Sequence, residues 1–508
     1  MKKVTSKKTD FLKKLQDSYN HLINPETGSS EIIKKLEKEE KEDSYLEKWY
    51  KFSKKSEEVY PSQGLLLTPY DYINFKMLQM LPQDMIIKTL RVRRYFLEIF
   101  NHPYRLFFLN DVDKQKFIPP PKITCKAIEN AIDKGLSLAI GDLGAAMAGS
   151  ESARISRRER YAQGPFIKLG KQARALFVGS SSQDVWSSAA SIATMASSHC
   201  LAAIPRNGLL YDIKRQSDLA NEVFDWLKIL EKDILGSRSN RGKIAKYWRG
   251  NVMGTVEASS DKALRRADSL IKTGVRTFRI YSPEPGRGTI DTAKALFKHY
   301  GNKIEIFTSF IVDVNQAKRA EEAGADGIFV GIGGGGRCTT GIRSGSAIDW
   351  PELVYKLRGE INIPIIVEGG ATDHVATSLL LGTSGISVSR AVSGGTIESP
   401  GGALFLSDEQ GNLFKPYGGE ASARAKFIEK KLLAFDIPSF IEGETGKAYL
   451  NYGKHTMPTL TFNLHTLTED ATLAMVFKGV SNIHELHSLD PSPLRQITTF
   501  GEFQRNTH

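Results

Sequence analysis

The feature of the sequence that most constrains its fold is a regular alternation of short apolar runs and longer amphipathic stretches beyond residue 250. The apolar runs are rich in β-branched residues and have the length of buried strands. They cover Val252–Val256, Val275–Tyr281, Ile304–Phe310, Gly327–Val330, Ile363–Val367 and Gly385–Val388. The pattern therefore predicts at least six strands in this half of the chain.

Segments with helical periodicity separate most of these runs, at Ser260–Lys272, Thr289–Tyr300 and Val314–Ala323. Helical segments end just before the next strand at three glycines, namely Gly274, Gly324 and Gly382. Glycine in this position adopts the left-handed conformation that ends a helix. Repeated strand–helix units predict a parallel sheet with right-handed crossovers. Six strands at this spacing favour an α/β fold, a closed (β/α)8 TIM barrel, with the earlier strands drawn from residues 60–205.

Composition limits the class of protein. The 508 residues are 41% hydrophobic and 25% charged, which excludes a disordered or fibrous chain. No apolar run approaches the ~20 residues of a membrane-spanning helix, and no apolar region of a signal peptide follows the basic start. We therefore expect a cytoplasmic protein that does not enter the membrane. The net charge of +12 favours anionic partners, and nucleic acid, acidic lipid and phosphorylated metabolites all qualify.

Changes in composition and charge along the sequence suggest three parts. Residues 1–60 form a charged helical N-terminal extension, residues 61–490 the barrel domain, and residues 491–508 a C-terminal tail. Positive and negative charges nearly balance in the extension, so it gives no strong nucleic-acid signal; a solvated helix and a docking segment both fit it. Within the barrel domain, the polar stretch at about 206–249 resembles an exposed insertion.

Three predicted strands are followed by polar or glycine-rich loops. The loop after Gly327–Val330 runs from Gly331 to Cys338, the next strand is followed by Glu368-Gly369-Gly370, and the last by Ser389-Arg390-Ala391. Barrel ligands bind at the carboxyl ends of the strands. Glycines there let backbone N–H groups face an anion. Together with Arg390, the two glycine loops predict a phosphate cradle.

The three cysteines, Cys125, Cys200 and Cys338, are too widely spaced for a disulfide framework or a zinc motif. Cys338 ends the longest glycine loop, beside a cation and two hydroxyls, where a thiol can act as a nucleophile. A small buried hydrophobe is the alternative for any free cysteine, and it is what we expect for Cys125 and Cys200.

At these loops the sequence resembles the IMP dehydrogenase/GMP reductase family. The similarity is firm over about 250–455 and faint before 205, and an ordered series of motifs carries it. The series consists of Ala323–Gly333 with Cys338-Thr339-Thr340, Ile363–Gly370, Glu398-Ser399-Pro400-Gly401, Lys415-Pro416-Tyr417-Gly418-Gly419, Glu442-Gly443 and Tyr452-Gly453-Lys454.

The resemblance implies a chemistry. Cys338 would attack purine C2 of a nucleoside monophosphate and form a covalent thioimidate, and hydride would pass to or from NAD or NADP. Thr340 and Glu442 would handle protons. Backbone carbonyls of Gly333, Gly335 and Cys338 would bind potassium in members that use the ion, and homotetramers are common in the family.

The resemblance also implies binding residues. On the substrate side, Glu368 would hold the ribose hydroxyls, and the phosphate and its surroundings would be held by Gly336, Gly369, Gly370, Arg390, Ala391, Tyr417 and Gly419. On the cofactor side it implies Ser282, Gly331 and Gly333.

Three features favour the reductase branch or another reaction without hydrolysis of the thioimidate. The loop has the reductase form Cys338-Thr339-Thr340, and no Arg-Tyr pair precedes Glu442-Gly443. The polar stretch at 206–249 is too short for the paired regulatory (CBS) module of many dehydrogenases.

Several positions depart from the family pattern. Glycine replaces a serine at Gly336, and Arg390-Ala391 replaces a Gly-Ser pair, so a bidentate guanidinium could offset the lost hydroxyl. Glu368 replaces a shorter aspartate, Ser282 another aspartate, and Phe310 an asparagine. Four functions therefore stay open: a GMP reductase-like enzyme, an IMP dehydrogenase, an FMN-dependent barrel oxidoreductase, and a nucleotide-binding protein without turnover.

Overall fold

The computed structural model describes most of the chain from residue 77 onward. The described residues are 77–146, 155–180, 188–206, 208–282, 287–331, 344–345, 349–389, 392, 394–418, 422, 426 and 446–501. The predicted N-terminal extension lies outside them.

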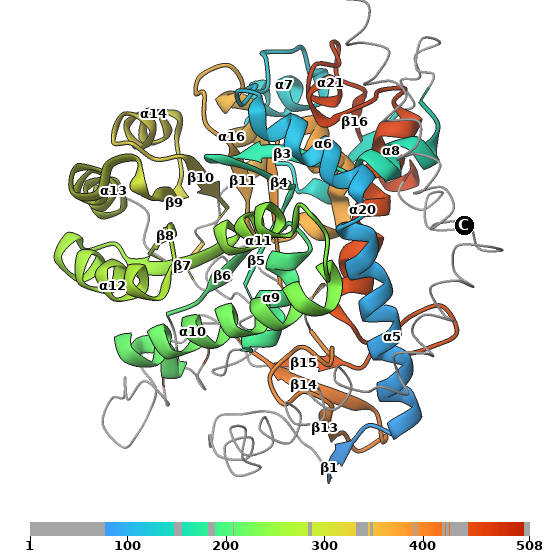
Figure 1. Ribbon diagram of the computed structural model, residues 1–508. Helices are drawn as coiled ribbons and strands as arrows, with labels where there is room; N and C mark the ends of the chain where they lie inside the picture. The colour runs from blue at the N-terminus through green and yellow to red at the C-terminus, as the bar shows by residue number, and fades with distance from the viewer. Residues whose placement is uncertain are drawn as a thin grey trace, which may run out of the picture.

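Eight parallel strands close into a barrel at the centre of the molecule (Figure 1). Around the barrel the order is β10-β11-β12-β5-β6-β7-β8-β9, and β12 pairs with β5 to help close it. The strands are β5 (Phe177–Ser180), β6 (Leu201–Ile204), β7 (Val252–Glu257), β8 (Thr277–Tyr281), β9 (Glu305–Ile311), β10 (Gly327–Val330), β11 (Ile365–Val367) and β12 (Gly385–Val388). The predicted TIM barrel is confirmed, and its first two strands come from the region before residue 205 as expected.

Helices surround the barrel and connect its strands. They include α9 (Ala189–Ser197), α12 (Ser260–Thr273), α13 (Arg287–Tyr300), α14 (Val314–Glu322), α16 (Trp350–Leu357) and α17 (Val375–Leu381). The predicted glycine stops are present, since Gly274 and Gly382 are left-handed caps of α12 and α17, both with φ of 114°. Outside this ring, α5 (Gln83–Phe100) and α20 (Leu460–Phe477) lie side by side (Figure 1).

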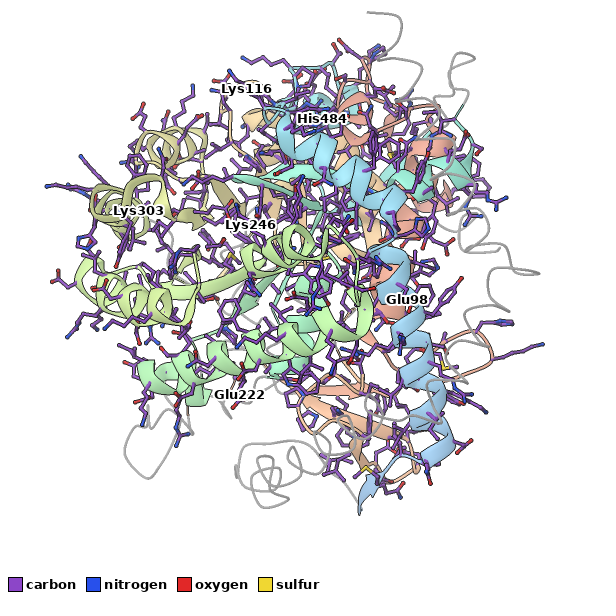
Figure 2. The ribbon with its side chains drawn as sticks, viewed as in Figure 1. Glu98, Lys116, Glu222, Lys246, Lys303 and His484 are labelled. Carbon is purple, nitrogen blue, oxygen red and sulfur yellow. The ribbon has the colours of Figure 1, made fainter. Side chains whose placement is uncertain are left out.

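The stretch at 206–249 is not the exposed insertion that its composition suggested. It contains α10 (Ile213–Leu230) and α11 (Arg241–Gly250), which form the crossover from β6 to β7. Their outer faces are polar, with Glu222 and Lys246 exposed (Figure 2). The inner face of α10 packs against α9 and α12. It buries residues at helical spacing, namely Leu219, Ala220, Val223, Leu227 and Leu230.

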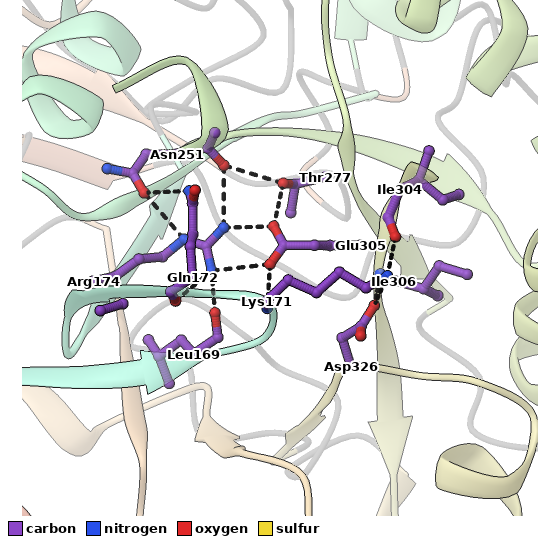
Figure 3. A network of polar contacts seen from close by, with 12 residues as sticks. Leu169, Lys171, Gln172, Arg174, Asn251, Thr277, Ile304, Glu305, Ile306 and Asp326 are labelled. Carbon is purple, nitrogen blue, oxygen red and sulfur yellow. Dashed lines mark hydrogen bonds and ion pairs between the residues drawn. The ribbon is translucent and has the colours of Figure 1, made fainter. Parts of the chain in front are cut away.

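A buried ion pair lies at the amino ends of the barrel strands (Figure 3). A hairpin of β3 (Phe166–Leu169) and β4 (Gln172–Ala175) carries Arg174, whose Nη2 lies 2.5 Å from Oε2 of Glu305 on β9. The two side chains are 0% and 9% exposed. Arg174 Nε donates to Asn251, and Thr277 Oγ1 donates to Glu305. A buried charge is tolerated only when it is paired and hydrogen-bonded, so this network fixes the hairpin beneath the barrel.

A second, antiparallel sheet lies beyond the carboxyl end of β12. Its order is β1-β13-β14-β15, formed by β1 (Met77–Met80), β13 (Leu404–Ser407), β14 (Leu413–Tyr417) and β15 (Gly446–Tyr449). Another short antiparallel pair joins β2 (Leu143–Ala145) to β16 (Leu494–Gln496). Among the described helices, none is long and apolar enough to cross a membrane.

Removal of Arg174 tests the network at the amino ends. We expect Arg174→Met to lower the free energy of unfolding by about 3–5 kcal/mol, because it leaves Glu305 buried without its main partner. Arg241→Met is the control: its pair with Glu231 is 41% exposed on the arginine side, so a loss of at most ~1 kcal/mol is expected. Denaturant unfolding of both variants measures the difference. Equal losses would contradict a special role for the buried pair.

Four histidines, three of them buried and His465 half-buried, make stability depend on pH. Burial lowers the pKa of His102, His199 and His487 to about 3 and that of His465 to about 4. Below an unfolded pKa of about 6.5 the unfolded chain binds protons that the folded chain does not, so stability falls as the pH falls from 6.5 toward these values.

The contribution of His487 can be isolated. Its Nε2 lies 3.0 Å from the carbonyl oxygen of Thr383, and the amide of a glutamine can supply the same kind of donor. We expect His487→Gln to reduce the loss of unfolding free energy between pH 7 and pH 5 by about 2 kcal/mol. The exposed His299 provides the control His299→Gln, which should leave the slope unchanged. An unaltered slope in His487→Gln would contradict the assignment.

Candidate active site at the carboxyl ends of the strands

Predicted site residues meet where β10 and β11 end. Val330 pairs with Val367, and the backbone N–H of Glu368 donates to the carbonyl oxygen of Val330 at 2.9 Å. This register sets Gly331 directly beside Glu368, so close that a Cβ on Gly331 would overlap the Glu368 carbonyl oxygen. The structure thus brings these two residues together as the sequence suggested.

The residues after Glu368 have the backbone of a glycine turn. Gly369 and Gly370 have φ of 94° and 76°, in the left-handed region that favours glycine. Gly370 precedes the short helical turn Ala371–His374. The glycines predicted to bind phosphate therefore form a tight turn at the rim of the barrel, as a strand-end ligand loop requires.

An arginine inside the barrel engages Glu368 from across the barrel. Arg279 lies on β8, and its Nη1 and Nη2 both donate to the Glu368 carboxylate, Nη1 to Oε1 at 3.4 Å. Arg279 Nε donates to Ser309 Oγ at 3.0 Å, and Ser309 in turn donates to the carbonyl oxygen of Ile280. The arginine side chain is 8% exposed and the glutamate side chain 30%. The pair thus joins the buried interior to the open rim.

Aromatic rings enclose this guanidinium. Arg279 Cζ lies 4.1 Å from the ring centre of Phe329, 4.9 Å from that of Tyr281 and 5.8 Å from that of Phe310. Cations over aromatic faces are stabilised, more so away from water. Tyr281 and Phe310 pack edge to face with centres 5.6 Å apart. They form an apolar wall next to Ser282 at the end of β8.

The other end of the predicted phosphate site involves Tyr417. This residue ends β14 of the second sheet, and its hydroxyl lies 2.9 Å from Ser389 Oγ, immediately after β12. The contact brings the Lys415–Gly419 motif to the strand end that precedes Arg390 and Ala391. The structure therefore links two motifs that are well separated in the sequence.

Buried charged residues stabilise the segments that bring Tyr417 to Ser389. Lys415 Nζ donates to the carbonyl oxygens of Thr396 and Ser399, at 2.9 and 3.1 Å, and to that of Gly402. Burial holds the pKa of Lys415 well below its ordinary value, against the opposing charge of Glu398. The motif around Glu398 thus has a structural part, and it fixes the strand that carries Tyr417.

Several predicted site residues cannot be placed in this way. Cys338, Thr340, Glu442, Gly333, Gly335, Gly336, Arg390, Ala391 and Gly419 lie outside the described residues. Within the described residues, no group of three or more histidine, cysteine, aspartate or glutamate side chains could hold a metal ion.

The other two cysteines have the surroundings of core residues. Cys125 and Cys200 are 1% and 2% exposed. Burial raises the pKa of the Cys200 thiol to about 12, and a protonated thiol is a poor nucleophile. The expectation that both are small buried hydrophobes is confirmed.

Arg279 and Ser309 were not among the site residues predicted from the sequence. A signal was present, because alternate residues of a strand share a face and Arg279 lies two residues before Tyr281 within a predicted barrel strand. A charge in such a strand must find a partner inside the barrel. The identity of that partner depends on the order of the strands, which the sequence does not specify.

The fold and the rim define a class: a (β/α)8 barrel with a polar, glycine-lined site at the carboxyl ends of its strands. The chain belongs to the IMP dehydrogenase/GMP reductase family. A family model described as "IMP dehydrogenase / GMP reductase domain" matches residues 110–508. The match begins well before residue 205, where the motifs are faint, and runs through the C-terminal tail.

Curated relatives agree with this assignment at modest identity. The chain is 25% identical over 272 residues to inosine-5′-monophosphate dehydrogenase of Aquifex aeolicus, covering 50% of this chain and 52% of the relative. It is 29% identical over 299 residues to the Helicobacter pylori protein of that name, covering 56% and 57%. With inosine-5′-monophosphate dehydrogenase 1 of Arabidopsis thaliana it shares 29% over 190 residues, covering 36% of each. The chain therefore spans between about a third and three fifths of these relatives.

Gly331 offers a test of the packing at the rim. We expect Gly331→Ala to destabilise the protein by about 1–3 kcal/mol more than Gly274→Ala, because its new methyl group must displace the Glu368 backbone. Gly274 has nearly the same φ, 114° against 116°, but a Cβ there would come no closer than 3.5 Å to Phe224, so this control accounts for the backbone strain. Thermal or denaturant unfolding measures both. Equal destabilisation would contradict the tight contact between Gly331 and Glu368.

Proposed function

We propose that the protein is a nicotinamide-dependent oxidoreductase that acts on a purine nucleoside monophosphate. The observation that carries the proposal is the position of Glu368 and its glycine turn beside Gly331, where the loop leading to Cys338 begins. The family assignment and the relatives named inosine-5′-monophosphate dehydrogenase support the same substrate class. They favour a purine nucleotide over the FMN of the alternative barrel enzymes.

In this mechanism the chain binds the nucleotide along the rim. Glu368 accepts hydrogen bonds from the ribose hydroxyls. The phosphate lies against Gly369 and Gly370 and contacts Tyr417. Arg390, Ala391, Gly336 and Gly419 complete that grip. The Cys338 thiolate then adds to purine C2 and forms the thioimidate, with Thr340 and Glu442 moving protons at the leaving and entering groups.

A bound nicotinamide cofactor, NAD or NADP, would supply or accept the hydride at C2. The residues present fit a flat ring at this place, because Tyr281 and Phe310 pack edge to face beside Ser282, and Gly331 follows β10, which is separated from β8 by β9 alone. Gly333 would complete the cofactor side. Potassium, if used, would be held by carbonyls of Gly333, Gly335 and Cys338. Cytoplasmic location and assembly as a homotetramer remain predictions.

The sequence favours the reductase direction over the dehydrogenase. In that direction Cys338 adds to C2 of GMP, ammonia leaves, hydride enters C2 and the thiolate is released to give IMP. The form of the Cys338-Thr339-Thr340 loop supports this order of events, as does the lack of an Arg-Tyr pair before Glu442. The buried Phe310, in place of an asparagine that would contact the base, keeps a nucleotide-binding protein without turnover as the second candidate.

Removal and labelling of Cys338 test the proposal. We expect Cys338→Ala to lower turnover by ~10⁴-fold or more, as loss of a covalent nucleophile does, and Cys125→Ala to leave it within a few fold. Iodoacetamide should label Cys338 first, and GMP or IMP should protect it, as intact-protein mass spectrometry would measure. Absorbance of the reduced nicotinamide follows turnover.

The outcomes separate the alternatives. Consumption of NADPH with GMP identifies the reductase, and reduction of NAD with IMP identifies the dehydrogenase. Tight nucleotide binding with no absorbance change identifies the binding protein without turnover. Turnover that survives in Cys338→Ala would overturn the covalent mechanism, and a yellow protein with a flavin spectrum would overturn the substrate class.

A further inference from the structure

We propose that Arg279 is a positioning residue that holds the Glu368 carboxylate for the ribose of the nucleotide and so sets the preference for ribo- over 2′-deoxyribonucleotides. The inference rests on the proposed function, because it concerns the ribose end of the same site. It concerns a residue that the sequence did not single out.

The geometry of the Arg279–Glu368 pair leaves part of the carboxylate free to accept further hydrogen bonds. β8 and β11 are not neighbours, because β9 and β10 lie between them in the barrel. The Glu368 side chain therefore reaches back across the barrel to Arg279. Each carboxylate oxygen receives one donor from the guanidinium. A carboxylate oxygen has two acceptor directions, so one on each oxygen remains for a diol.

The Glu368 carboxylate is accessible from the mouth of the barrel. The Glu368 side chain is 30% exposed whereas that of Arg279 is 8% exposed, so the free acceptor directions can face the mouth of the barrel. Within the described part of the chain, Arg279 is the one side chain that donates to Glu368. The contrast is Glu305 at the other end of the barrel, which accepts from Arg174, Thr277 and the Lys171 backbone. Both oxygens of Glu305 therefore accept hydrogen bonds from several groups of the protein. Among the described residues, the side-chain oxygens of Glu368 accept hydrogen bonds from Arg279 alone.

The Arg279 guanidinium is held rigidly by its neighbours. The guanidinium is fixed by Ser309 at 3.0 Å and by the rings of Phe329 and Tyr281 at 4.1 and 4.9 Å. It cannot swing to another partner without breaking these contacts. A glutamate has more rotatable bonds than an aspartate, and a flexible group is a poor ligand unless it is ordered beforehand. Arg279 supplies that order.

Binding of a ribonucleotide and its 2′-deoxy analogue tests the inference directly. The probes are GMP and 2′-deoxy-GMP, measured by isothermal titration calorimetry on the full chain. In the native protein we expect GMP to bind about 10- to 100-fold more tightly, which is the value of one hydrogen bond to a charged group. In Arg279→Met the ratio should fall to within ~3-fold, mostly through weaker binding of GMP.

Three further variants make the result specific. Glu368→Gln should lower the ratio in the same way, and Arg279→Met added to it should lower the ratio no further. Arg279→Lys, which keeps the charge but not the two-point contact, should give an intermediate ratio and serves if the methionine variant does not fold. The control is Arg266→Lys, because Arg266 is another buried arginine bonded to a strand-end carboxylate, Glu257; it should leave the ratio unchanged.

The outcomes distinguish this inference from the function on which it rests. A native protein that binds neither of these nucleotides nor IMP would overturn the proposed function and the inference together. If IMP binds and GMP does not, IMP and 2′-deoxy-IMP replace the two probes. If native binding is tight but shows no ribose preference, only the inference fails. The same holds if Glu368→Gln abolishes the preference while both Arg279 variants keep it, or if they weaken both nucleotides equally, since Arg279 then has a general structural role.

Discussion

Eight parallel strands that close into a barrel leave an interior that side chains must fill, and this chain fills it with charges at both ends. Arg174 and Glu305 meet at the amino ends, and Arg279 and Glu368 at the carboxyl ends. Between them lie Phe307 and Phe329, with ring centres 6.3 Å apart. Charges in such a place destabilise the fold unless each has a partner. Their pairing therefore constrains the register and order of the strands that carry them.

The two pairs differ in how far their carboxylates are open to solvent. The Arg174–Glu305 pair is closed to solvent and fully bonded within the protein, as expected where only structure is needed. The Arg279–Glu368 pair is closed at the arginine and open at the glutamate. In (β/α)8 barrels the amino-end face serves stability and the carboxyl-end face chemistry, and the exposure of the two carboxylates follows that division.

Much of the fold could be predicted because local signals were strong. The strands from Val252 onward are short, rich in β-branched residues and separated by helical stretches, a combination typical of a parallel sheet, and glycines such as Gly274 mark the ends of helices. The segment with α10 was misjudged because its polar face dominates composition, while its buried residues are revealed by their spacing. The sheet that pairs Met77–Met80 with Leu404–Ser407 could not be anticipated, since its strands are distant in the sequence.

The candidate site, like the fold, could be predicted from the sequence only in part. Glu368 and its glycines could be found because a strand-end position and a motif coincide there, whereas Arg279 is a single charge within a strand and its partner depends on the closed topology. The structure also gives a reason for the longer acid at Glu368. A carboxylate that must reach toward β8 gains from one more methylene, and Arg279 then fixes the flexibility that the methylene adds. The two residues are therefore coupled: the arginine fills the barrel interior, and the glutamate extends its charge network to the rim.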